Sequence, residues 1–178
     1  YKKGIIKKRK SFFTKQDSFI NDDFIIDPKI IEAIVYNKPL PLLEFSAFKN
    51  TIDLLGKIYE LSQNRYDSEI TTSSLIYEVK TMISCNQQFP LIKHIKELNL
   101  NGIDSFLLLY LAWKAMSSSG KIHLTYIAEK IFDKSSEGIT YIQDIMSNEN
   151  DLIERGLIET DQAIFLDDLS VKLTKSSI

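Results

Sequence analysis

A run of basic side chains near the start of the chain is its densest group of potential ligand contacts: Lys7, Lys8, Arg9 and Lys10. Lysine and arginine attract phosphates and carboxylates through their charge, so this run is a candidate contact for nucleic acid or for an acidic partner. Residues 1–15 carry seven basic side chains and no acid, whereas residues 16–178 carry 15 basic and 24 acidic side chains. The formal net charge of −2 is therefore the sum of a basic leader, residues 1–15, and an acidic body, residues 16–178.

Motifs for nucleotide binding are incomplete. A phosphate-binding loop needs Gly-x-x-x-x-Gly-Lys-Ser/Thr, because successive backbone N–H groups wrap the phosphates. The pairs Gly56-Lys57 and Gly120-Lys121 are each followed by Ile, and neither has a glycine five residues upstream. We therefore expect no catalytic residue and no cofactor in this chain.

Metal-ligating and nucleophilic side chains are also sparse, and consist of His94, His123 and the lone Cys85. A zinc site takes three or four ligands, usually with close pairs, so we expect no metal. A Cys85–His94 nucleophilic pair is conceivable, but no flanking signature supports it, and ordinary surface residues are favoured. A single cysteine cannot form an internal disulfide, which fits a reducing cytoplasm.

Apolar spacing and proline positions divide the chain into four parts. Helical periodicity dominates from residue 46 onward, so the fold class is predicted to be mainly α. The longest apolar run spans residues 106–113, which is too short for a membrane span of about 20 residues and predicts a fully buried helix. The predicted parts are a flexible basic leader (1–18), a short helix with a Pro-containing linker (19–45), a helical subdomain (46–102) and a winged-helix-like subdomain (103–178).

Residues 103–178 predict the order helix, short strand, helix, turn, helix and β-hairpin, which is the layout of a winged helix-turn-helix. Asn150 suits an N-cap and Gly156 a helix stop. The predicted hairpin pairs residues 157–160 with 163–166 across a two-residue turn, and a last helical turn with Leu169, Val171 and Leu173 follows. A plain α-bundle with one incidental hairpin fits the helix count as well.

The helix in the DNA-recognition position, near 136–149, carries three acids and no base. Gln143 and Asn148 could touch base edges, but phosphate contacts require Lys or Arg. Residues 122–178 hold five basic and eleven acidic side chains, so a phosphate backbone would be repelled. Groove binding is therefore disfavoured, although the leader could still attract nucleic acid.

Two stretches, residues 106–113 (FLLLYLAW) and 148–159 (NENDLIERGLIE), together with the helix near 48–61, carry a family resemblance. They resemble the winged-helix region preceding the ATPase core of certain bacterial AAA-family ATPases, over about 46–175. In that family an acidic, Leu, hydrophobic, x, x, Gly-Leu-Ile element precedes the wing, and residues 151–158 match it. The chain lacks the phosphate loop of the core, so no catalytic residue is carried over. The resemblance implies a non-catalytic regulatory or adaptor module.

Three functions follow as hypotheses. The first is a cytoplasmic protein-interaction module that binds a protein partner or an adjacent ATPase domain and no membrane. The second is a winged-helix DNA-binding transcriptional regulator whose basic leader supplies phosphate affinity. The third, a small α-helical enzyme, would need a deep pocket with convergent polar groups. Because the chain begins at Tyr1, we expect a piece of a longer protein, and a phosphate loop encoded downstream of Ile178 would favour the first hypothesis.

Overall fold

The computed structural model describes residues 6–8, 24–26, 31, 35–36, 48–64, 70–161 and 169–175. The chain divides into two units, Tyr1–Ser46 and Ala47–Ile178. In the first unit, β1 (Ile6–Lys8) pairs antiparallel with β2 (Phe24–Ile26), and Ile6 lies opposite Ile26. The short helix predicted within residues 19–45 falls mostly outside the described residues.

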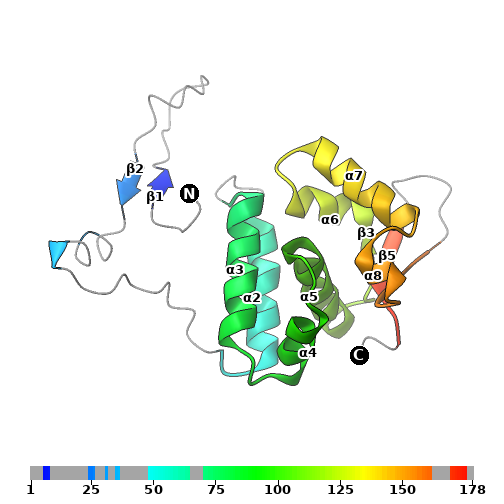
Figure 1. Cartoon of the computed structure of the whole chain (residues 1–178), viewed down its shortest axis with the longest axis horizontal. Helices are drawn as coiled ribbons and strands as arrows, with labels where there is room; N and C mark the ends of the chain where they lie inside the picture. Colours follow the sequence, from blue (N-terminus) through cyan, green and yellow to red (C-terminus); the bar gives the residue numbers. More distant parts are fainter. Residues whose placement is uncertain are drawn as a thin grey trace. The chain divides into compact units, whose positions relative to one another are not determined.

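Helices make up most of the second unit. A mainly α-helical chain is therefore confirmed. Figure 1 shows them as α2 (Thr51–Asn64), α3 (Thr72–Cys85), α4 (Pro90–Leu98), α5 (Gly102–Ser117), α6 (Leu124–Ile131), α7 (Ser135–Met146) and the single turn α8 (Asp151–Glu154).

Helix α5 is the core of the second unit. Residues 106–111 are all buried, because α5 packs against α2, α3 and a strand of the sheet. A helix that is apolar all round has to be enclosed in this way, so the prediction of a fully buried helix is confirmed for these residues. Within the described part of the chain, no helix is long and apolar enough to cross a membrane.

A small antiparallel sheet closes the second unit. It contains β3 (Ile122–His123), β4 (Ile158–Thr160) and β5 (Ser170–Leu173), in the spatial order β3-β5-β4. The central strand β5 places Val171 opposite both Ile122 and Thr160. The sheet therefore joins the strand before α6 to the strands after α8.

The pairing of β4 differs from the sequence prediction in the part that the structure describes. Residues 158–160 pair with β5, which the sequence pattern did not predict to be a strand. The predicted partner, residues 163–166, lies outside the described part of the chain. The predicted last helical turn is wrong, since Ser170–Leu173 is a strand. Leu169, Val171 and Leu173 recur every second residue, which is the period of a strand with one buried face.

Local capping signals set the turn after α7. The side chain of Asn150 accepts a hydrogen bond from the backbone N–H of Leu152 at 2.9 Å, so the predicted N-cap is confirmed. Gly156 has φ of 64°, in the left-handed region where glycine is the favoured helix stop. Arg155 ties this turn to α4, because its Nη1 donates to the carbonyl oxygen of Leu98 at 2.7 Å.

Candidate functional site

The outer face of α7 presents apolar side chains to solvent. Ile139 is 52% exposed and Met146 is 50% exposed, two helical turns apart on the same side. Gln143 is exposed between them. The opposite face of α7 is buried and packs the helix onto the unit through Tyr141 and Ile145. The helix in the recognition position therefore exposes aliphatic surface where a DNA-binding helix would need bases.

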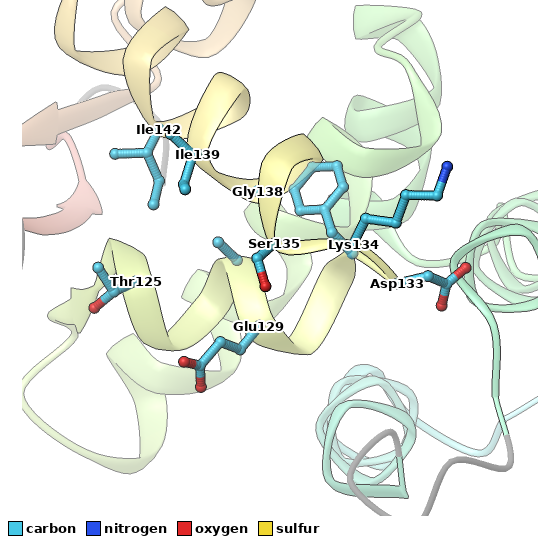
Figure 2. Close-up of a pocket in the computed structure, with 10 residues that line it drawn as sticks. Thr125, Glu129, Asp133, Lys134, Ser135, Gly138, Ile139 and Ile142 are labelled. Carbon is cyan, nitrogen blue, oxygen red and sulfur yellow. The ribbon is translucent and has the colours of Figure 1, made fainter.

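A groove lies beside this face, between α6 and α7, where the two helices approach closely. A Cβ on Gly138 would lie 3.3 Å from the Cβ of Ala128, so glycine is what lets the helices pack at this distance. Figure 2 shows Ile139 and Ile142 on α7, with Thr125 and Glu129 on α6. The groove has a volume of about 270 Å³. Its lining is Thr125, Ala128, Glu129, Phe132, Asp133, Lys134, Ser135, Gly138, Ile139 and Ile142.

The surface around the groove is more acidic than the sequence suggests. Residues 124–146 contain four acids, Glu129, Asp133, Glu137 and Asp144, and two lysines. Lys130 is only 1% exposed, and the Nζ of Lys134 lies 3.4 Å from a carboxylate oxygen of Glu137. Of the two lysines, one is removed from the surface and the other is held beside an acid. The exposed charge at this surface is therefore negative.

Lys130 turns inward from α6 toward α2. Its Nζ lies 3.5 Å from the side-chain oxygen of Gln63 and 5.2 Å from the ring centroid of Tyr126. The sequence gives no sign that Lys130 is buried, so its positive charge is counted there among the surface charges. In the structure this charge is withdrawn from the surface. The four-residue spacing from Tyr126 signals only the contact with the ring, since such a spacing sets a cation beside a ring on one helix face.

A buried carboxylate positions α7. Asp104, at the start of α5, is fully buried and accepts hydrogen bonds from Tyr141 Oη at 2.6 Å and from Asn150 Nδ2 at 3.2 Å. Its other oxygen accepts from Asn101 Nδ2 at 2.6 Å. These bonds connect the first turn of α5 to α7 and to the cap of α8. Burial and then the neighbouring Asp104 carboxylate raise the pKa of Tyr141 well above its ordinary value.

This network makes stability sensitive to alkaline pH. Because the pKa of Tyr141 is higher in the folded chain, the unfolded chain loses the phenol proton first, and folding weakens above about pH 10 by about 1.4 kcal/mol per pH unit. Tyr141→Phe is expected to make this decline shallower in urea unfolding from about pH 9 to about pH 11. Some decline remains, since burial also raises the pKa of Tyr110. This account would be contradicted if the unfolding free energy of Tyr141→Phe fell with pH as steeply as that of the wild type. It would also be contradicted if Tyr77→Phe, at an exposed position, made the fall equally shallow.

The residues predicted as a basic contact belong to the first unit. Lys7 and Lys8 lie in β1, and Arg9 and Lys10 lie outside the described residues. That contact stays a prediction.

The remaining candidate ligands are surface residues. His94 is exposed on α4, His123 is exposed at the end of β3, and Cys85 is exposed at the end of α3. Over the residues whose positions are described, no three His, Cys, Asp or Glu side chains form a group that could hold a metal ion.

Comparisons of the chain with protein-family models, curated proteins and solved structures found no match. The resemblance to an AAA-family winged-helix region therefore rests on the sequence motifs alone. The function has to be argued from the α6–α7 surface, its apolar groove and its charge.

Proposed function

We propose that this chain is a non-catalytic protein-interaction module whose C-terminal half is a winged helix, of the kind that accompanies the ATPase core of AAA-family ATPases. The element order α5, β3, α6, α7, α8, β4, β5 supports the winged-helix assignment, since it keeps the predicted succession of helix, short strand, helix, helix and strand pair. The pairing of β3 and β4 with the same central strand adds support, because it joins the short strand and the hairpin into one sheet.

The single observation that carries the proposal is the character of the exposed face of α7. A helix that docks into DNA needs Lys or Arg to neutralise phosphates. This face instead exposes Ile139 and Met146, and α7 as a whole carries the acids Glu137 and Asp144 and no Lys or Arg. Exposed aliphatic residues and methionine beside polar neighbours are typical of a surface that binds protein. A phosphate loop encoded downstream of Ile178 would support the link to an ATPase.

The alternative is a DNA-binding regulator, and only the basic leader favours it. Fluorescence anisotropy with a generic duplex at several salt concentrations separates the two functions. We expect any binding to depend on the leader, so that changing Lys7, Lys8, Arg9 and Lys10 to Ala lowers the slope of log affinity against log salt by up to about 3–4. Gln143→Ala on α7 is expected to leave the affinity unchanged.

The opposite pattern would favour the regulator. If Gln143→Ala weakened duplex binding about tenfold while the leader variant bound normally, α7 would be reading DNA, and the interaction module would be the wrong assignment. Preference for one duplex sequence over others would point the same way, because phosphate contacts alone carry no sequence information.

A further inference from the structure

We infer that the groove between α6 and α7 binds a basic segment of a partner protein that inserts one large apolar side chain. The inference rests on the proposed function and names the chemistry of the partner. Small-molecule pockets hold about 300–1,000 Å³. The groove, at about 270 Å³, falls just below that range and suits one anchoring side chain. Interfaces concentrate their binding energy in anchors of this kind.

The lining of the groove fits an apolar anchor. Ala128 and Ile142 are buried in it, Phe132 is half-buried, and Ile139 stands exposed at its edge. Met146 continues the aliphatic surface along α7, so a bound segment could extend past the anchor. The close packing of Gly138 on Ala128 fixes the two helices that form most of the groove, and the short connection between them completes it. A preformed groove of this kind loses little conformational freedom on binding.

The charged residues at the rim of the groove favour a basic partner segment around the apolar anchor. Glu129, Asp133 and Lys134 line the groove and are exposed, and Lys134 is offset by Glu137, whose carboxylate oxygen lies 3.4 Å from its Nζ. Asp133 also accepts from the backbone N–H of Thr72 at 3.1 Å, which fixes that carboxylate at the end of α6. Negative charge around an apolar groove attracts a positively charged segment and repels nucleic acid or an acidic peptide.

Peptide selection tests the inference without knowledge of the natural partner. A random library of roughly 15-residue displayed peptides, long enough to form a helix, is selected on the immobilised chain. We expect the enriched peptides to be lysine- or arginine-rich and to share one large apolar residue. A synthetic version is then titrated against the variants, and replacing its apolar residue with Ala should weaken binding about tenfold.

Matched variants locate the site. Ile139→Glu is expected to weaken peptide binding at least about tenfold, because it places charge at the mouth of the groove. Ile52→Glu is the control, since Ile52 is similarly exposed, at 55%, on α2. Glu129→Lys is expected to weaken binding about threefold or more by reversing a rim charge. Glu97→Lys makes the same charge change on α4 and should have little effect.

The outcomes separate this inference from the proposed function. Peptides that are acidic or lack an apolar anchor, yet lose binding in Ile139→Glu, would overturn the partner chemistry and leave an interaction module. If no peptide is enriched, or if Ile139→Glu does not change peptide binding, both this inference and the proposed interaction module are overturned. Self-association of the wild-type chain that Ile139→Glu abolishes would assign the groove to a second copy and overturn the inference. So would duplex DNA that displaces the peptide from the groove.

Discussion

Asp104→Ala is expected to lower the free energy of unfolding by roughly 3–5 kcal/mol, as measured by urea denaturation at neutral pH. The substitution leaves two buried donors, Tyr141 Oη and Asn150 Nδ2, and the exposed Asn101 Nδ2 without their acceptor. Each buried donor left unpaired costs about 1–3 kcal/mol, which is more than the net worth of the bond itself. Because the two buried donors come from α7 and from the cap of α8, the substitution is expected to loosen the packing of α7 beside the groove as well as the core.

The chain contains its own control for this prediction. The start of α2 repeats the Asn-x-x-Asp arrangement, where Asn50 Oδ1 accepts from the backbone N–H of Asp53 at 2.9 Å and Asn50 Nδ2 donates to the Asp53 carboxylate at 3.0 Å. There the pair is exposed and Asp53 has no donor from another helix among the bonds of the described residues. Asp53→Ala is therefore expected to cost no more than about 1 kcal/mol.

A second variant keeps the test decisive if Asp104→Ala does not fold. Asp104→Asn preserves the shape but places an amide N–H₂ where a carboxylate oxygen accepted, so at least one neighbouring donor faces a donor. We expect an intermediate loss of about 1–3 kcal/mol. Equal losses for Asp104→Ala and Asp53→Ala would show that Asp104 acts only as a helix cap and not as the link between α5, α7 and α8.

The features that could be predicted from the sequence are those with local causes. Pro90 opens α4, and Asn150 and Gly156 bound α8, because proline, asparagine and glycine impose their geometry on their immediate neighbours. The absence of bases on α7 could also be predicted, since it needs only the helix boundaries. Apolar spacing was sufficient to identify α5 as a buried helix.

The features that escaped prediction depend on residues far apart in the chain. The strand β4 pairs with β5 across residues 161–169, and no turn signal specifies a pairing over that length. Asp104 meets Tyr141 across 37 residues, although the Asn101-x-x-Asp104 spacing signals the cap. The groove depends on the close packing of Gly138 on Ala128. The distance between these two residues is set by how α6 and α7 pack in the folded chain.

Two glycine substitutions are expected to have opposite effects on stability. Gly102→Ala should lower the free energy of unfolding by about 1–3 kcal/mol. Gly102 is buried at the first position of α5, and a Cβ there would collide with Cγ2 of Ile76 and lie 3.3 Å from the Cβ of Ile76. Ile76 is β-branched and within α3, so it has few other rotamers, and α3 would have to move away from α5.

Gly56→Ala should instead raise the free energy of unfolding by about 0.5–1 kcal/mol. Gly56 lies in the interior of α2, where alanine restricts the unfolded chain and favours the helix. Its Cβ would rest 3.6 Å from two ring atoms of Trp113, which is an ordinary contact. Neither Gly56 nor Gly102 has a positive φ, so backbone strain does not enter either comparison.

A double-mutant cycle identifies the cause of the Gly102 effect. Ile76→Ala removes the colliding Cγ2, so Gly102→Ala should cost about 1 kcal/mol less in that background than in the wild type. The coupling would show that α3 and α5 are in contact through these two residues and that glycine is required there for space. If Gly102→Ala costs the same in both backgrounds, the loss arises elsewhere, and the close approach of α3 to the first turn of α5 is not what the glycine protects.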